Sequence, residues 1–185
     1  MGSTDLRAAS VAEVLSCLGV PHATRYRREF SEVLRNDRDL ATDDWSAEPE
    51  LLEVFYCYLR HSRPSIVVEI GTYKGTAAIV FHAAVLKNGT GRVVTIDNNK
   101  AGTLRAARKR FKAREIGSGI TLLEKSSNRA FVKWKREPID FLFIDGSHNY
   151  RHSCCDFALW ARMVTKQGMI AIHDTGVDPI FETTG

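Results

Sequence analysis

The chain has 185 residues, of which 44% are hydrophobic and 26% are charged, and its formal net charge is +4. These values are typical of an ordinary globular protein and argue against a disordered or fibrous chain. No apolar run approaches the roughly 20 residues that span a bilayer, and the N-terminus lacks the apolar core of a signal peptide, so we expect a cytoplasmic protein without a membrane partner.

Residues 1–60 carry no catalytic signature and are expected to form a helical cap on a domain of residues 61–185. Ser10 and Glu13 form a capping-box pattern that predicts the start of a first helix. Residues 22–48 are polar and charged, and we expect a loop there with one short helix. A second amphipathic helix is predicted where apolar residues share one face: Leu51, Leu52, Phe55, Tyr58 and Leu59.

From Ser65 onward, short apolar strands alternate with helical patterns. The strands are expected at Ile66–Ile70, Arg92–Asp97, Ile120–Glu124, Ile139–Asp145 and Met169–Ile172. The helices are expected at about 75–87, 100–115, 128–136 and 150–165. Such alternation is typical of an α/β fold with a doubly wound, Rossmann-like parallel sheet and helices on both faces.

The densest positive charge lies between Lys100 and Arg114. Leu104, Ala107 and Phe111 form an apolar stripe there, which favours a solvated helix face over a nucleic-acid site. No interleaved aromatic residues support base stacking, so no nucleic-acid partner is expected. Anionic substrates remain open.

The four cysteines do not suggest a metal site or a disulfide framework. Cys17 and Cys57 are isolated, Cys154 and Cys155 are adjacent, and no pair has C-x-x-C spacing. Reduced thiols are therefore the simpler interpretation.

The first strand runs into a glycine turn and a helix, with the sequence I-V-V-E-I-G-T-Y-K-G-T. A strand, a turn and a helix start in this order present backbone N–H groups to a ligand. The dinucleotide fingerprint G-x-G-x-x-G is absent, and the pattern is E-x-G-x-x-x-G instead. An acid at Glu69 would repel a pyrophosphate, but it suits a ligand with a cationic end and a ribose.

This pattern resembles motif I of the class I S-adenosylmethionine-dependent methyltransferases. Glu69, Gly71 and Gly75 match the motif, whose loop, here with Thr72 and Tyr73, wraps the methionine part of the cofactor in that family.

Downstream residues extend the resemblance. Asp97 ends the second strand, followed by Asn98, and it matches the family acid that bonds the ribose hydroxyls. Ser126 and Ser127 match the position that meets the adenine, although Ser127 could equally cap the helix that follows.

The ends of the fourth and fifth strands read I-D-G-x-H-x-Y and I-H-D-T. These motifs resemble a branch of small-molecule O-methyltransferases that includes macrolide-sugar, cephalosporin-biosynthesis and rhamnosyl methylating enzymes. If the fourth and fifth strands are neighbours, Asp145 and Asp174 would lie about 5 Å apart. Both residues are candidates to bind Mg²⁺ and to act in catalysis, and Asp145 is also a candidate to bind the cofactor. His148 is a candidate base that could equally be structural, whereas a structural role is the favoured interpretation of His173. Thr175 stands where several metal-dependent relatives carry a further acid or amide.

The resemblance covers residues 65–175, and the domain is expected to be C-terminally short, without the last two strands of the family's sheet. A fragment, a naturally short form and a chain completed by a partner all fit this pattern. An exposed edge at the fifth strand would favour a homo-oligomer or covering of that edge by residues 1–60. The leading function is O-methylation of a small hydroxylated acceptor, which the sequence does not identify. A non-catalytic methyltransferase-like binding module and, less favoured, an NAD-dependent oxidoreductase are the alternatives.

Overall fold

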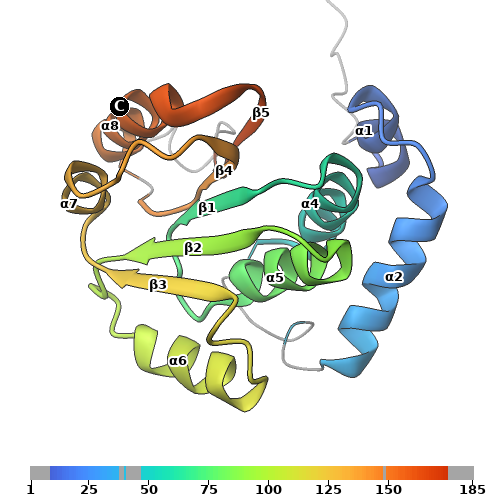
Figure 1. Cartoon of the computed structure of the whole chain (residues 1–185), viewed down its shortest axis with the longest axis horizontal. Coiled ribbons are helices and arrows are strands. Elements are labelled where there is room, and N and C mark those ends of the chain that lie inside the picture. Colours follow the sequence, from blue (N-terminus) through green and yellow to red (C-terminus); the bar gives the residue numbers. More distant parts are fainter. Residues whose placement is uncertain (1–8, 38–39, 41–46, 148, 175–185) are drawn as a thin grey trace, which may run out of the picture.

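A computed structural model of the chain describes residues 9–37, 40, 47–147 and 149–174. Its centre is a five-stranded sheet with the strand order β3-β2-β1-β4-β5, in which every pair is parallel (Figure 1). The strands are β1 (Ile66–Ile70), β2 (Arg92–Asp97), β3 (Ile120–Glu124), β4 (Ile139–Ile144) and β5 (Val164–Ile172). The predicted doubly wound α/β fold is confirmed. Within the described ranges, no helix is long and apolar enough to cross a membrane.

Two helical layers enclose the sheet. One layer holds α4 (Pro49–Ser62), α5 (Thr76–Asn88) and α6 (Leu104–Ala113), and the other holds α7 (Ser127–Val132) and α8 (Tyr150–Trp160). Two further helices, α1 (Val11–Cys17) and α2 (Ala23–Asn36), pack on the outer side of α4 (Figure 1). A short 3-10 helix (Ala161–Met163) joins α8 to β5.

Strand residues alternate between two hydrophobic clusters, as the period of two in a strand requires. Val67, Phe141 and Phe143 face the layer of α4 and α5, whereas Val68 and Leu142 face the layer of α7 and α8. All five side chains are fully buried. The continuous apolar runs of the sequence are therefore explained by burial of the central strands on both faces.

Strand β5 begins at Val164 rather than at the predicted Met169. Its first half is polar and only partly buried, so the sequence pattern does not reveal it. The pairing with β4 is irregular between Ile139 and Phe141, and it becomes regular from Met169 onward.

The interpretation of residues 22–48 as a loop with one short helix is wrong for the part that the structure describes. Helix α2 is 14 residues long and buries Phe30, with Tyr26 and Leu34 packed on the same core. These apolar residues recur every four positions, and the many arginines and glutamates between them hid the pattern. The capping box of Ser10 and Glu13 at α1 is confirmed.

The N-terminal helices share the core of the sheet. Phe55 on α4 contacts Phe81 on α5 and both Phe141 and Phe143 on β4, with ring centroids 5.0 to 6.0 Å apart. The expected division into a cap of residues 1–60 and a domain of residues 61–185 stays a prediction.

His82 on α5 gives the fold a pH dependence. Its side chain is buried, its Nδ1 has no hydrogen-bond partner among the described residues, and burial lowers its pKa from the ordinary value of 6.5. The unfolded chain binds a proton at His82 more readily than the folded chain does. We therefore expect the free energy of unfolding to fall as the pH drops below about 6.5. Each pH unit would cost at most about 1.4 kcal/mol.

Urea unfolding of the wild type and of His82→Gln at several pH values checks this expectation. The wild type should lose more stability than the variant between about pH 7.5 and about pH 5.5. Parallel losses in the two proteins would contradict it.

Candidate functional site

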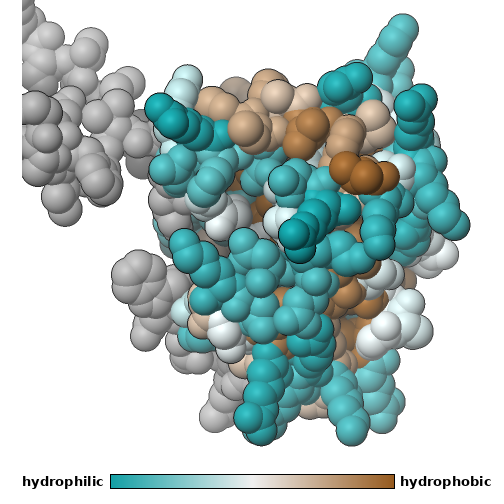
Figure 2. Space-filling model, turned by 90° about the vertical axis from the view of Figure 1, so that its left-hand side faces the viewer, coloured by the Kyte–Doolittle hydropathy of each residue, from teal (hydrophilic) through white to brown (hydrophobic). Residues whose placement is uncertain are grey.

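Polar side chains gather at the carboxyl edge of the sheet. The arrowheads of β2 and β3 point to the left in Figure 1, and Figure 2 shows that side of the molecule. This face is largely hydrophilic, with hydrophobic side chains gathered near its top (Figure 2). In open parallel sheets, ligands bind beyond the carboxyl ends of the strands, so the candidate site lies on this face.

The turn between β1 and α5 requires both of its glycines. Gly71 has a φ of +103°, and a Cβ built there would lie 2.0 Å from the carbonyl oxygen of Asp145. Gly75 has a φ of +83°, and its Cβ would lie 2.6 Å from the ring of Phe111 on α6. The glycines therefore let the turn approach the start of the β4–α8 loop on one side and α6 on the other.

Asp97 at the end of β2 holds this turn in place. Its Oδ2 accepts hydrogen bonds from the backbone N–H groups of Thr72 at 3.1 Å and Tyr73 at 3.0 Å. Its Oδ1 accepts one from the N–H of Asn99 at 2.6 Å. Tyr73 adopts a φ of +47°, which is uncommon for a non-glycine residue. The carboxylate of Asp97 thus connects the β1–α5 turn with the β2–α6 loop.

Glu69 lies beneath the turn, where its side chain is 1% exposed. It accepts a hydrogen bond from Thr95, whose hydroxyl also lies 2.5 Å from that of Thr72. Burial raises the pKa of Glu69 well above its ordinary value, and nearby Asp145 and Asp97 act in the same direction, whereas the bond from Thr95 opposes them. Glu69 is therefore placed to support the turn from below.

A first cavity of about 320 Å³ opens above the turn, and we call it the nucleotide cavity because residues predicted from the sequence to bind a nucleoside cofactor line it. Five of the residues predicted to bind the cofactor line it: Gly71, Asp97, Asn98, Ser126 and Ser127. The lining described for this cavity does not include Glu69, Thr72, Tyr73 or Gly75, which lie in or beneath the turn. Its far wall is one face of α8: His152, Cys155, Asp156 and Leu159.

The alternative role of Ser127 as a helix cap is wrong. Helix α7 begins at Ser127, and the N-cap position belongs to Ser126, whose side chain donates to Asn128 at 2.6 Å. The hydroxyl of Ser127 instead donates to Asp156 on α8. Sequence reasoning missed Asp156, because nothing in the sequence shows that α7 and α8 lie side by side.

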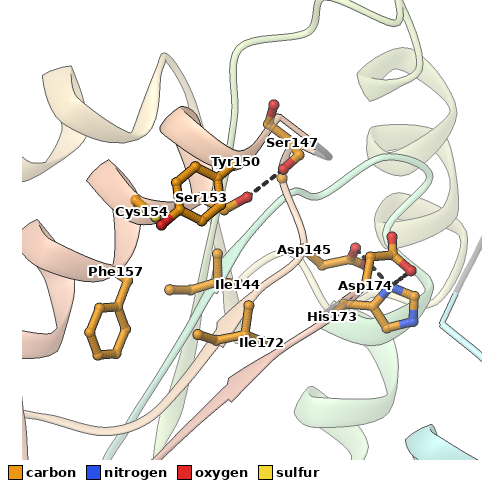
Figure 3. Close-up of a pocket in the computed structure, with 11 residues that line it drawn as sticks. Ile144, Asp145, Ser147, Tyr150, Ser153, Cys154, Phe157, Ile172, His173 and Asp174 are labelled. Carbon is orange, nitrogen blue, oxygen red and sulfur yellow. Dashed lines mark hydrogen bonds and ion pairs between the residues drawn. The ribbon is translucent and has the colours of Figure 1, made fainter. Parts of the chain in front are cut away.

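A second cavity of about 440 Å³ lies on the other side of α8 (Figure 3). Ile144 and Ile172 from the sheet and Tyr150, Cys154 and Phe157 from α8 line one part of it. Asp145, His173 and Asp174 line another part, and Gly146 and Ser147 belong to both cavities. The loop that follows β4 thus separates the nucleotide cavity, whose lining includes Asp97, Asn98 and Asp156, from a cavity with an apolar wall and a charged group.

His173 stands between the two predicted carboxylates (Figure 3). Its Nδ1 lies 3.3 Å from Asp145 Oδ1 and 3.1 Å from Asp174 Oδ1. Its Nε2 lies 3.0 Å from Glu48 Oε2, next to the start of α4. Since Ile144 pairs with Ile172, the residue opposite Asp145 is His173, and Asp174 lies one position further, with a φ of +52°.

The carboxylates determine the charge of this imidazole. Burial alone would lower the pKa of His173, but the hydrogen bond with Glu48 and the negative charges of Asp145 and Asp174 together raise it above its ordinary value. The same interaction with His173 lowers the pKa of Glu48. When His173 is protonated, its positive charge relieves the mutual repulsion of the two carboxylates, which the sequence-based hypothesis expected a metal ion to do.

The structure brings Asp145 and Asp174 together as predicted, whereas the predicted base His148 lies outside the described residues, as does Thr175. His173 and Glu48 are the participants that sequence reasoning did not assign. The position of His173 directly before Asp174 could have identified it, because it faces Asp145 in the sheet register. The contact of Glu48 spans 125 positions in the sequence, and only the fold reveals it.

Comparisons with known proteins identify the family of this chain and structures with a similar fold. A family model described as a methyltransferase domain matches residues 68–175. The SAH-bound methyltransferase PaMTH1 from Podospora anserina is similar in structure, with a TM-score of 0.62 and 18% identity over 94% of this chain and 73% of that one.

Two O-methyltransferases are also similar in fold. TomG from Streptomyces achromogenes, which is involved in tomaymycin synthesis and was solved in complex with SAM, gives a TM-score of 0.62 and 17% identity over 78% of this chain and 64% of that one. An O-methyltransferase from Bacillus cereus in complex with SAH gives a TM-score of 0.58 and 18% identity over 82% of this chain and 66% of that one. The chain therefore spans about two thirds of the length of several structures that it resembles.

Proposed function

This chain belongs to the methyltransferase domain family, and from that premise we propose that it transfers the methyl group of S-adenosylmethionine to a hydroxyl oxygen of a small molecule. The observation that carries this proposal is the turn of Gly71 to Gly75, which Asp97 holds open at the edge of the nucleotide cavity. The family match favours methyl transfer over the hydride transfer of an NAD-dependent oxidoreductase.

The nucleotide cavity has the order of groups that the cofactor needs. Gly71 with the adjoining turn would face the methionine part, Asp97 and Asn98 the ribose, and Ser126 and Ser127 the adenine. Asp97 has both oxygens engaged by backbone N–H groups, but a carboxylate oxygen accepts more than one hydrogen bond, so it still suits ribose hydroxyls.

The chemistry requires alignment and the removal of one proton. The acceptor oxygen forms a bond to the methyl carbon, the carbon–sulfur bond breaks with its electron pair going to sulfur, and the hydroxyl proton leaves to a base. Asp145, His173 and Asp174 would orient the hydroxyl and receive its proton, with His148 as a further candidate base. The apolar wall of the second cavity would contact the hydrophobic part of the acceptor.

The same group of residues has a donor set that suits a divalent metal ion. One ligand atom from each of Asp145, His173 and Asp174 lies within 4.8 Å of the others. Two carboxylates and an imidazole fit such an ion, and the nitrogen donor suits Mn²⁺ or Zn²⁺ at least as well as the Mg²⁺ expected from sequence. When bound, the metal would lower the pKa of the acceptor hydroxyl.

Calorimetric titration with S-adenosylhomocysteine tests the proposal. We expect micromolar binding to the wild type and a loss of at least about 100-fold in affinity in Asp97→Ala, because the charged hydrogen bonds that hold the turn and the ribose contact are lost together. Absence of binding to the wild type would overturn the proposed function for this chain.

The register partner of Asp97 provides a matched control. Glu124 ends the neighbouring strand and binds Arg108, but it does not line the nucleotide cavity. Glu124→Gln should leave the affinity within about threefold of the wild type, because exposed ion pairs contribute little. An equal loss in both variants would assign the effect to general destabilisation.

A non-catalytic binding module, the alternative expected from the sequence, is the second candidate. Such a module would bind S-adenosylhomocysteine without turning over any acceptor. Incubation with labelled S-adenosylmethionine and a panel of hydroxylated small molecules separates the two candidates.

A further inference from the structure

Helix α8 presents two different faces to the two cavities. His152, Cys155, Asp156 and Leu159 line the nucleotide cavity, whereas Tyr150, Ser153, Cys154 and Phe157 line the second cavity (Figure 3). Each set follows the spacing i, i+3, i+4, i+7 that defines one side of a helix. Of the residues on the first face, only Asp156 carries a carboxylate.

Asp156 is unusually buried for an acidic residue, since only 8% of its surface is exposed. Ser127 on α7 donates a hydrogen bond to its Oδ1, and Asp156 accepts no other hydrogen bond from the part of the chain that the structure describes. Buried carboxylates are costly unless donors surround them, so Asp156 retains capacity for a further donor. Burial accordingly raises the pKa of Asp156, while Ser127 and His152 oppose this shift.

The place of Asp156 in the nucleotide cavity indicates which donor it would meet. Asp97 and Asn98 stand at the end of β2, and Ser126 and Ser127 follow β3, the next strand outward. A nucleoside whose ribose binds at Asp97 would therefore extend its base toward α7 and the first face of α8. The 6-amino group of adenine is a donor on the base edge, whereas a 6-oxo group at the same place is an acceptor.

We propose that Asp156 determines base specificity by accepting a hydrogen bond from the 6-amino group of the cofactor's adenine, with Ser127 holding the carboxylate in position. This inference rests on the proposed function, because it assumes an adenosyl cofactor. It assigns a role in cofactor selection to α8, whose other face lines the second cavity. A 6-oxo base would place two acceptors against each other in a buried site, which is strongly unfavourable.

The test compares S-adenosylhomocysteine with S-inosylhomocysteine, in which a 6-oxo group replaces the 6-amino group. Calorimetry on the wild type should show a preference for the adenosyl ligand of about 100-fold or more, the scale of discrimination when a buried polar group is left unpaired. Equal affinities for the two ligands would overturn the inference without any variant.

In the Asp156→Asn variant, we expect a change in the preference between the two ligands that a purely structural role of Asp156 would not produce. Its amide matches the carboxylate in shape but offers an N–H donor to a 6-oxo group, so the preference for the adenosyl ligand should shrink by at least about tenfold. Equal weakening of both ligands, with the preference unchanged, would show that Asp156 only supports the fold.

Two further proteins complete the experiment. Arg151→Gln, on the same helix but in the lining of neither cavity, should leave the preference unchanged. Ser127→Ala removes the donor to Asp156 without removing the carboxylate, so it should weaken binding while the adenosyl ligand remains preferred. Loss of the preference in Arg151→Gln would contradict the assignment to Asp156. Failure of the wild type to bind either ligand would overturn the proposed function together with this inference.

Discussion

Replacing Gly71 with alanine should abolish binding of S-adenosylhomocysteine and destabilise the fold by about 3 kcal/mol or more. The added Cβ would lie 2.0 Å from the carbonyl oxygen and 2.5 Å from the carbonyl carbon of Asp145, both backbone atoms of the adjacent loop. The chain would have to move the β1–α5 turn, the β4–α8 loop or both, and the two cavities meet there. Thermal unfolding and calorimetry measure the two effects.

Gly89 provides the matched control, because it ends α5 with a φ of +70° and a Cβ there would meet nothing within 4 Å. Gly89→Ala should therefore cost only the strain of a left-handed alanine, about 1–2 kcal/mol, and leave affinity unchanged. Similar losses of affinity in both variants would show that close contact with Asp145 is not what makes Gly71 necessary.

Replacing Asp145 with asparagine should reduce turnover by about 100-fold to 10,000-fold while leaving the affinity for S-adenosylhomocysteine nearly unchanged. Asp145 lies next to both cavities, since it lines the second one and precedes Gly146 and Ser147, which line both. An amide in its place keeps the shape but loses the charge that acts on His173 and on the acceptor hydroxyl.

Turnover with a methyl acceptor, measured beside calorimetry, checks this expectation, and Glu115→Gln on the exposed surface after α6 serves as the control. Retained turnover in Asp145→Asn would remove Asp145 from the mechanism. Absence of turnover in the wild type, with binding intact, would favour the non-catalytic module instead.

The sequence by itself determined the fold class and the edge of the sheet at which the candidate site residues gather. The alternation of short apolar runs and helical patterns depends on local spacing, and four of the five strands lie where that spacing predicts them, to within one residue. The glycine turn was equally readable, because Gly71 and Gly75 adopt conformations that few other residues tolerate. Asp97, Asp145 and Asp174 were identified because each follows or ends a strand.

Only the tertiary structure decided what these groups contact. Glu69 matched the motif but lies buried beneath the turn, since strand position alone does not say how deep a side chain is. Ser127 was ambiguous until α8 supplied Asp156 beside it. Glu48, just before α4, reaches His173 across 125 positions, and such contacts depend on how helices pack on the sheet, which no local pattern of residues encodes.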